Sequence, residues 1–590
     1  MFKSNESHKT DFLRDWRDLL GPKKLANLQQ SKGYLFYEII FCNIVESDFS
    51  VLYSSKSRTP NSPINCMISA LFLLHQRNWS YEELMSQIDF NVEIRVALGL
   101  KNLQDRPFTE RTLFNFKNRL SKHAHQTGEN LLEKVFDSLT KSQLKRLKIK
   151  TNIQRCDSVL LDTNIRTYSR LSLLVEVLRR VYRILSKTDQ ATYQSLFAPY
   201  LKGGEKFVYS LNGEGQQIHL EALAQVYYSI HTLLKEPYAE EEVFQMFERA
   251  YDDHFKVIEE EAKFPLQLRP KEELSSTSLS SPDDLEATCR IKRGETHLGY
   301  VGFGAETCHP DNELNLVTKV ALQTNNTDDS KILEDKLEQM TELTPDLDEL
   351  HQDGGFGSQA VDRIANEYPN PILLVQTAIK GTPPDLPIPI DGTEKEGFTL
   401  NCPNPEHPAV KARKLHKNYR ADFNLDICES CPFKDICPTK RERKYRKKIA
   451  AFRFKLPDVL KQKRHKAIHQ IPKERRNLRA GVENLMARLH RGEKHTGKFK
   501  IRGQFNFECY VFAMGCVINF ERIFRFISNK LAFLVHLAIQ LLLSIISCQR
   551  TQYTRRRRQN RGGRKPRAPG PRQTHPTCCL AWGSPRESPR

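Results

Sequence analysis

Segments with the composition of β-strands lie far apart in the middle of this chain of 590 residues. The first is 153–167 (IQRCDSVLLDTNIRT), and strand-like sequence returns only at 289–324, at 348–353 and at 371–377. Between the first two, residues 168–285 repeat apolar side chains at the spacing of an α-helix. The polar stretch LSSTSLSSPDD (274–284) at their end is typical of a linker. Strands and helices that alternate along a chain in this way indicate an α/β fold.

The N-terminal quarter of the chain reads as a succession of helices without strands. Residues 64–76 (INCMISALFLLHQ) have the apolar content of a buried helix, and Ser80 followed by Glu83 has the capping-box spacing that begins another. Thr109 precedes a further helix in the same way. We therefore expect an all-α N-terminal domain over residues 1–145.

Basic side chains in the last helix of this region suggest two interpretations. The stretch RTLFNFKNRL places Arg111, Lys117 and Arg119 among apolar residues. A helical bundle with a basic final helix is typical of a DNA-binding domain, in which Arg111 and Lys117 would contact DNA. A bundle with a purely structural role fits the same pattern.

Positive charge is concentrated in two segments of a chain whose net charge is +20. Residues 411–480 carry 23 Lys and Arg against 7 Asp and Glu, and residues 551–590 carry 11 against 1. A concentrated basic field attracts a polyanion, usually DNA or RNA, although a solubilising charge run is the plainer alternative. The Arg, Pro, Gly and Ser content of residues 550–590 also predicts a disordered tail.

Four cysteines have the spacing of a zinc site. Cys428, Cys431 and Cys437 lie within ten residues of one another, and Cys402 is a reasonable fourth ligand, a place that His407 also fits. Tetrahedral structural zinc favours four such ligands with a close Cys-x2-Cys pair. The spacing is irregular beside a standard zinc ribbon, so thiols that are coincident or redox-sensitive remain the alternative.

Several classes of protein are disfavoured by the sequence. The N-terminus has no apolar core of an export signal, and the other cysteines are scattered, as in a protein of the reducing cytosol. The apolar run 531–546 is shorter than a membrane span and contains His536 and Gln540, which favours a core helix. The glycines of the second strand region match no phosphate-binding loop and are read as hairpin turns or bulges: 294, 299, 302 and 304.

Two acids compete for a functional position in the first strand. Asp157 is followed by the apolar Val159, Leu160 and Leu161, and an acid in such a strand is costly to bury unless it is paired or binds a metal. Asp162 lies five residues further on, so a regular strand points it to the opposite face. Only one of the two acids is expected to face a site.

Two further acids stand in positions that suit a site. Asp353 opens an Asp-Gly-Gly-Phe-Gly loop after a strand, where a flexible turn presents a carboxylate at the edge of a sheet. Glu483 lies four residues after Arg479, so the two share one helix face. The plainer alternatives are a solvated turn for Asp353 and a surface ion pair for Arg479 and Glu483.

Taken in chain order, these segments resemble bacterial insertion-sequence transposases of the DDE class, of the broad IS-four and IS-five kind, in a subgroup with a Cys-rich insert. The resemblance covers about residues 30–545. The motifs that carry it are INCMISALFLLHQRNWSYEELMSQI with RPFTERTLFNFKNRL, RCDSVLLDTNIR, NNTDDSKILEDKLEQ with HQDGGFGS, the Cys-rich insert, and RNLRAGVENLMARLHRGEKHTGKFKIRG.

The resemblance implies a fold and a domain order. It implies an RNase H-like mixed sheet flanked by helices, with strands near 153–163, 289–305, 313–323, 348–353 and 371–377. The catalytic domain would span 150–378 and 471–548, with a helical insertion at 168–285 and a basic Cys-rich insertion at 380–470.

The resemblance also implies a reaction. It selects Asp157 over Asp162 and makes Asp157, Asp353 and Glu483 the ligands of two Mg²⁺ ions that support DNA cleavage and strand transfer. Arg479 would position a DNA phosphate. The implied partners are transposon ends and target DNA, bound by a homodimer in the bacterial cytoplasm at the nucleoid.

Two departures from the family pattern affect the expected DNA contacts. Relatives often have a Tyr three residues before the Arg and a Lys seven residues after the Glu, where this chain has Arg476 and His490. His490 and Arg491 are then the candidate DNA contacts, and Lys494 is a further substitute. Two rival functions remain, a DNA-binding protein that has lost catalysis and a nuclease without strand transfer.

Overall fold

The computed structural model describes most of the chain and divides it into two compact units, residues 1–524 and 525–590. The described residues are 1–9, 12–54, 59–201, 208, 213–258, 265–376, 387–394, 396–416, 418–444, 447–492 and 497–530. The elements and contacts below belong to the first unit. The apolar run 531–546, Lys494 and the tail 550–590 lie outside the described residues.

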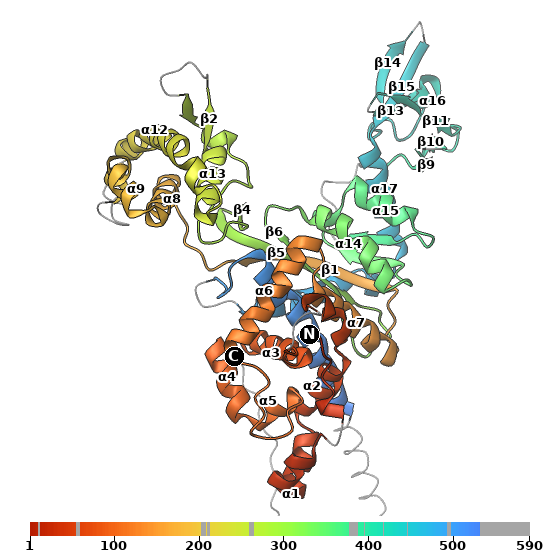
Figure 1. The fold of residues 1–590 in the computed structure, drawn as a ribbon. Helices are drawn as coiled ribbons and strands as arrows, with labels where there is room; N and C mark the ends of the chain where they lie inside the picture. Colours follow the sequence, from red (N-terminus) through yellow and green to blue (C-terminus); the bar gives the residue numbers. More distant parts are fainter. Residues whose placement is uncertain are drawn as a thin grey trace, which may run out of the picture. The chain divides into compact units, whose positions relative to one another are not determined.

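Helices make up the N-terminal region, as the sequence predicts (Figure 1). They are α1 (Arg14–Gln29), α2 (Lys32–Ile39), α3 (Ile64–Arg77), α4 (Tyr81–Phe90), α5 (Val92–Ala97), α6 (Glu110–Thr127) and α7 (Leu131–Arg146), with short 3-10 helices η1 (Ser7–Lys9), η2 (Phe41–Asn43) and η3 (Glu46–Leu52). The capping box of α4 is confirmed, because the Ser80 hydroxyl accepts from the Glu83 N–H and the Glu83 carboxylate accepts from the Ser80 N–H.

The N-terminal helices share one apolar core with the C-terminal part of the unit, where residues 504–524 are helical. Phe36 of α2 packs edge-on against Phe520, with ring centroids 5.1 Å apart. The buried Glu521 carboxylate accepts hydrogen bonds from Lys32 at 2.9 Å and Gln76 at 2.7 Å and pairs with Arg488. Elements more than 400 residues apart in the chain are therefore held together by burial and by one shared charge.

A six-stranded mixed sheet forms the centre of the unit and confirms the expected α/β class. Its strands are β1 (Ile153–Asp162), β4 (Thr288–Lys292), β5 (Glu295–Thr307), β6 (Val317–Thr324), β7 (Glu349–Gln352) and β8 (Leu373–Gln376), in the order β4-β5-β1-β7-β8 with β6 also paired to β5. The strands β4, β1 and β6 run antiparallel to β5, whereas β7 is parallel to β1 and β8 to β7.

The single strand expected over 289–305 is instead the hairpin of β4 and β5. The chain turns at Arg293 and Gly294, both at positive φ (55° and 85°). Gly294 confirms the turn that was read from the glycines, because φ in this region suits glycine. Arg293 adopts the same region at a cost that the pairing of Lys292 with Glu295 offsets.

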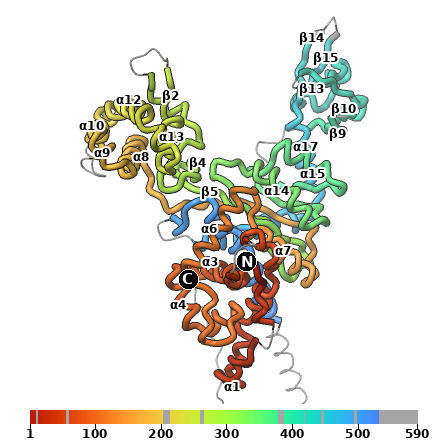
Figure 2. The backbone as a smooth tube through the Cα atoms, in the orientation of Figure 1, coloured from red at the N-terminus to blue at the C-terminus, as the bar shows by residue number. Residues whose placement is uncertain are grey.

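Helices cover both faces of the sheet. On one face, α14 (Asp329–Leu343) and α15 (Gln359–Glu367) pack apolar side chains against β5. On the other face, α7 contacts β6, and α18 (Glu483–Leu489) contacts β1 and β5. Figure 2 shows blue segments from late in the chain beside the orange N-terminal helices, with which they share an apolar core. Gly304 of β5 allows this approach, because a Cβ there would lie 2.9 Å from Leu485.

The insertion between β1 and β4 has its own apolar core. It contains α8 (Arg170–Ile184), α9 (Lys187–Thr192), α10 (Gln194–Leu201), α12 (Gly213–Tyr238), α13 (Glu242–His254), the hairpin β2 (Phe255–Val257) with β3 (Leu266–Leu268), and η4 (Lys271–Glu273). The hairpin was not expected. The polar stretch 274–284, expected to be a linker, is packed against protein: Asp284 is buried and accepts from Thr163, Tyr300 and Gly503.

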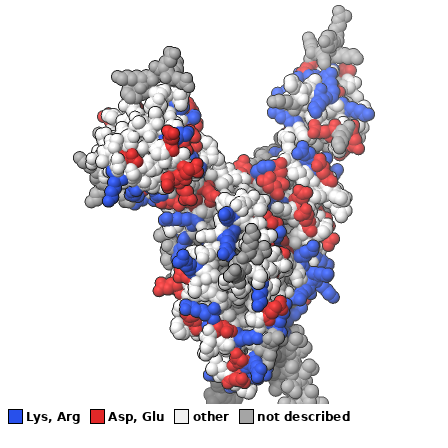
Figure 3. Space-filling view, viewed as in Figure 1, with Lys and Arg blue, Asp and Glu red and all other residues white. Residues whose placement is uncertain are grey.

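The Cys-rich segment forms two small antiparallel sheets around another apolar core. Its elements are β9 (Ile390–Thr393), β10 (Gly397–Leu400), β11 (Val410–Lys411), β12 (Arg413–Leu415), β13 (Asn418–Asn424), α16 (Leu425–Glu429), β14 (Lys440–Lys444), β15 (Lys447–Phe454) and α17 (Leu456–Gln470), followed by η6 (Lys473–Arg475). Asp422 and Glu442 are taken up in pairs with Arg413, Arg420 and Arg453. Figure 3 shows Lys and Arg side chains gathered at the surface of this segment.

Among the residues that the structure describes, no helix has both the length and the apolar content that a membrane span requires.

A larger residue at Gly304 should destabilise the unit. In Gly304→Val the new side chain overlaps Leu485 and Met486, and overpacking of this kind costs about 1–3 kcal/mol in the free energy of unfolding. Urea denaturation measures the loss. Gly213→Val is the matched control, because no atom lies within 4 Å of a Cβ at Gly213. Equal stability of the two variants would contradict the close packing of α18 on β5.

Candidate active site

Two of the three expected acids lie side by side because of the parallel pairing of β1 with β7. Ile153 pairs with Glu349 and Arg155 with His351, and the same register carried two residues further sets Asp157 beside Asp353. Neighbouring strands lie about 4.8 Å apart. Asp353 directly follows β7 and begins η5 (Gly354–Phe356), where its carboxylate accepts from the Gly355 N–H.

The third acid reaches the same place from the other end of the chain. Glu483 is the first residue of α18, and η7 (Leu478–Val482) leads into it. The Arg155 guanidinium of β1 holds η7 by donating to the Leu478 carbonyl at 2.8 Å. Gly481 has no room for a side chain, since a Cβ there would lie 2.0 Å from Arg155.

One guanidinium nitrogen joins the three acids. Nη2 of Arg479 lies 2.5 Å from Asp157 Oδ2, 3.6 Å from Glu483 Oε1 and 3.8 Å from Asp353 Oδ2. The sequence predicted the Arg479–Glu483 pair from its helical spacing, but the contacts of Arg479 with the two aspartates come from the fold. Arg479 therefore serves as the cation at the centre of a carboxylate cluster.

Burial governs the electrostatics of this cluster. Asp157 is buried, and burial raises the pKa of its carboxyl; the Ser158 N–H and Arg479 oppose this effect, and Glu483 and Asp353 add to it. The Glu483 side chain is 65% exposed. A deep acid beside two more accessible ones is an arrangement that an additional cation stabilises.

A fourth carboxylate, that of Asp329, borders the cluster, and it was not among the expected site residues. Asp329 begins α14 and accepts from the Ser158 hydroxyl at 2.7 Å. A Cβ at Gly355 would lie 2.9 Å from Asp329 Oδ2 and 3.3 Å from Asp353 Oδ1, so both acids line the same loop. In the sequence, Asp329 could have been found as a site residue from the pair of aspartates, Asp328 and Asp329, that begins a helix directly after a strand.

The donor set suits a hard cation. Carboxylate oxygens are the ligands that Mg²⁺ prefers. Among the described residues, no three His, Cys, Asp or Glu side chains are arranged at metal-binding distances, and the Arg479 guanidinium lies between the acids of the cluster. A metal ion in this place therefore requires the guanidinium to move away from at least one carboxylate.

Asp162, the rejected alternative, faces elsewhere. Its carboxylate pairs with Nδ1 of His297 at 3.0 Å. The odd spacing from Asp157 is the reason, because side chains five residues apart on a strand point to opposite faces.

The expected DNA contacts are not all gathered at the cluster. His490 donates from Nε2 to the Leu160 carbonyl at 2.7 Å and thereby joins α18 to β1. Arg491 is 61% exposed, with its nearest carboxylate, Glu521, at 3.9 Å. Arg111 and Lys117 lie on α6, away from the three acids in the fold, and Lys117 donates to the Tyr81 hydroxyl at 2.8 Å.

The four cysteines of the insert line one small cavity of about 40 Å³. Burial raises the pKa of the Cys402 thiol and raises that of Cys428 to about 11, and neighbouring thiols add to both effects. His407 is an unsuitable alternative ligand, because its Nε2 accepts from the Asn424 N–H at 2.9 Å and its Nδ1 is 3.0 Å from the Pro408 carbonyl.

The raised pKa of Asp157 has a consequence for stability. The pKa of Asp157 in the folded chain lies above the ordinary value of 3.8. The stabilising contribution of this carboxyl to the free energy of unfolding is therefore fully present below pH 3.8 and is lost as pH rises through the folded pKa. Asp157→Asn should therefore unfold at higher urea than the wild type at pH 7 in EDTA, and the difference should vanish toward pH 3.8.

Asp346→Asn is the control for simple loss of charge, because Asp346 is exposed. A wild type that is at least as stable as Asp157→Asn at pH 7 would show that burial does not dominate the energetics of Asp157.

Two family models match the chain. One, described as a transposase DDE domain, matches residues 401–524, which include the cysteines, Arg479 and Glu483. The other, described as a transposase domain (DUF772), matches residues 35–119 in the N-terminal helices. No curated protein and no solved structure matches. Together the two matched regions indicate a transposase of the insertion-sequence DDE family, whose members are enzymes that cut DNA and transfer its strands.

Proposed function

We propose that Asp157, Asp353 and Glu483 are the catalytic carboxylates of this transposase and that together they bind two Mg²⁺ ions. The observation that carries the proposal is the approach of all three to one nitrogen of Arg479. Like charges gather in this way only where a cation balances them.

All three acids would be ligands of the Mg²⁺ ions. Asp157, the most buried of the three, would hold the ions together with Asp353 and Glu483. When bound, two Mg²⁺ ions activate the attacking hydroxyl and stabilise charge on the phosphorus centre.

The reaction has two steps. Water attacks a phosphodiester at the transposon end, the P–O3′ bond breaks, and the leaving oxygen takes a proton to become a 3′-hydroxyl. That hydroxyl attacks a phosphodiester of the target DNA, and the displaced target oxygen leaves as a new 3′-hydroxyl. Arg479, freed from the carboxylates, would hold a non-bridging phosphate oxygen in either step.

DNA would be gripped mainly through its phosphates. The segment 411–480 carries 23 basic residues against 7 acidic ones, and Asp422 and Glu442 are already paired within it. In the division that we propose, residues 1–145 bind DNA, 150–378 with 471–548 catalyse, and 380–470 adds the basic surface. Phosphate contacts of this kind supply affinity more than sequence information.

We also propose a homodimer on DNA, located at the nucleoid. A transposon has two ends, and each chain presents one carboxylate cluster, so a dimer supplies one cluster for each end. The oligomeric state in the presence of end DNA checks this by analytical ultracentrifugation.

The four cysteines Cys402, Cys428, Cys431 and Cys437 are proposed to bind a structural zinc ion. They line one cavity, and binding of the ion requires the thiols to rearrange, because no three described His, Cys, Asp or Glu side chains could hold a metal ion as they stand. Four thiol ligands leave no position for a catalytic water, so the ion would stabilise the insert only.

Removal of Asp157 should abolish strand cleavage. The assay uses purified protein, Mg²⁺ and the DNA that flanks the gene with its terminal inverted repeats. Asp157→Ala should lower the cleavage rate by about 10³-fold or more, the scale on which one preorganised charged group acts. Asp162→Ala is the matched control on the same strand, since Asp162 pairs with His297 on the other face.

Cleavage that persists in Asp157→Ala would overturn the three-carboxylate mechanism. Cleavage by the wild type without joined products would identify a nuclease without strand transfer. Binding to the repeats without cleavage would identify a DNA-binding protein that has lost catalysis. This outcome is relevant because the chain has His490 where relatives often have a Lys.

Metal content tests the zinc proposal. Purified protein should carry one zinc ion per chain, and Cys431→Ser should lose it, because three thiolates bind zinc less well than four. Cys42→Ser serves as the control, since Cys42 is exposed and lies in the N-terminal region. A protein without zinc, in which all four thiols of the insert titrate freely, would contradict the proposal.

A further inference from the structure

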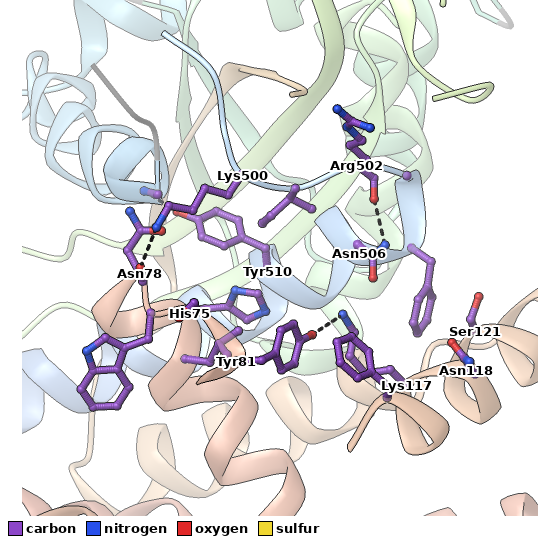
Figure 4. Close-up of a pocket in the computed structure, with 18 of the residues that line it drawn as sticks. His75, Asn78, Tyr81, Lys117, Asn118, Ser121, Lys500, Arg502, Asn506 and Tyr510 are labelled. Carbon is purple, nitrogen blue, oxygen red and sulfur yellow. Dashed lines mark hydrogen bonds between the residues drawn. The ribbon is translucent and has the colours of Figure 1, made fainter. Parts of the chain in front are cut away.

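A cavity of about 660 Å³ lies between the N-terminal helices and the segment that follows α18. One wall comes from the end of α3, the start of α4 and the exposed side of α6, and the other from Gly492 and residues 500–510 (Figure 4). Its volume is within the range of about 300–1,000 Å³ typical of sites for small molecules. None of the proposed catalytic residues lines it.

Aromatic rings form part of the wall. Tyr81 and Phe114 lie with ring centroids 4.4 Å apart, and Trp79 lines the cavity beside them. Phe114 is 40% exposed although it is a large apolar side chain. The two rings are tilted by 37° to each other, so each offers its own face, and an exposed aromatic face is a surface on which a nucleobase stacks.

Two lysines border these rings. Lys117 and Lys500 line the cavity, and within the described part of the chain neither forms an ion pair with a carboxylate; their ammonium groups donate to the Tyr81 hydroxyl at 2.8 Å and to the Asn78 carbonyl at 3.4 Å. The Arg502 side chain points away from the rings (Figure 4) and donates from Nε to the Asn164 carbonyl at 2.6 Å. Glu286 is the acid of the lining, and it already accepts from the Gln504 N–H at 2.8 Å and lies 3.9 Å from His125. The two lysines are therefore available to a phosphate.

One residue of the lining also carries a buried polar atom without a partner. Nε2 of His75 is shielded from solvent and makes no hydrogen bond with any described residue. Figure 4 shows the ring between Tyr81 and Tyr510, and its centroid is 5.5 Å from that of Tyr510. Burial lowers the pKa of His75 to about 3, so the ring is neutral. An unpaired polar group of this kind costs free energy that a ligand's hydrogen bond recovers.

We propose that this cavity binds a single unpaired nucleotide of the DNA, with its base on the aromatic wall, its phosphate at the two lysines and a polar edge at His75. A duplex is too wide to enter, so the base enters only after it has left its stack. The inference rests on the proposed function, because DNA must be the substrate.

The position of the cavity relative to the carboxylates supports a nucleotide of the strand being processed. Glu483 begins α18, and η8 (His490–Gly492) continues from it to the cavity wall at Gly492. At 1.5–2.0 Å per residue this helical path is roughly 15 Å long. Successive nucleotides on one strand are about 3.4 Å apart along a duplex, so a few nucleotides cover that length.

Binding of a bulged duplex tests the proposal. The probe is a duplex with one unpaired 2-aminopurine, compared with the same duplex fully paired, both in EDTA so that no cleavage occurs. The full chain should bind the bulged duplex about tenfold more tightly, the effect of one stacked base, and should quench the 2-aminopurine. Trp79→Ala and Phe114→Ala should each reduce this preference to about twofold or less and leave the affinity for the paired duplex within about twofold.

The control variant is Phe90→Ala, because Phe90 is 83% exposed on the same helix that carries Tyr81 but does not line the cavity. It should keep the tenfold preference. Phe114→Ala keeps the test valid if Trp79→Ala does not fold, since Phe114 is largely at the surface. Equal affinity of the wild type for the two duplexes would overturn the cavity proposal alone. Binding of neither duplex would overturn the proposed DNA binding and this inference with it.

Discussion

The ion pair between Arg479 and Asp157 is the interaction on which the candidate site depends. Three carboxylates approach one end of a central strand pair, and the guanidinium that they share is the charge that balances them. Its position is secured by a second pair, since Arg155 holds both the buried Glu306 carboxylate and the loop that leads to Glu483. Removal of Arg479 would leave the buried Asp157 carboxylate facing two other acids without their shared cation, which is costly.

The same interaction explains why the site is electrostatically strained. An arginine compensates Asp157 only in part, because burial still raises the pKa of its carboxyl. The free energy lost there is offset by ordinary packing elsewhere, such as the contact of Leu485 with Gly304. A site of this kind favours additional positive charge.

Local patterns predicted the parts of the fold that local forces decide. The strand around Asp157, the turn at Asp353 and the capped helix after Ser80 depend on neighbours within a few residues, and all three elements are present. The role of Asp329 and the three contacts of Arg479 depend on β6, β7 and η7 meeting in space, which no periodicity reveals. The β2–β3 hairpin lies in a region whose apolar spacing predicts helix, and the burial of Asp284 depends on partners that meet it only in the fold, Thr163, Tyr300 and Gly503.

One continuous helical segment of the chain leads from the carboxylates to the cavity. Glu483 at the start of α18 and Gly492 at its continuation are parts of one helical path, and His490 fastens that path to β1 through the Leu160 carbonyl. A nucleotide held beside His75 would therefore have a fixed position relative to β1, the strand that carries Asp157. Rigid helical connection is the means by which a binding site for one nucleotide positions the phosphodiester a few nucleotides away, because an error of about 1 Å at the reacting phosphate costs about 10²-fold in rate.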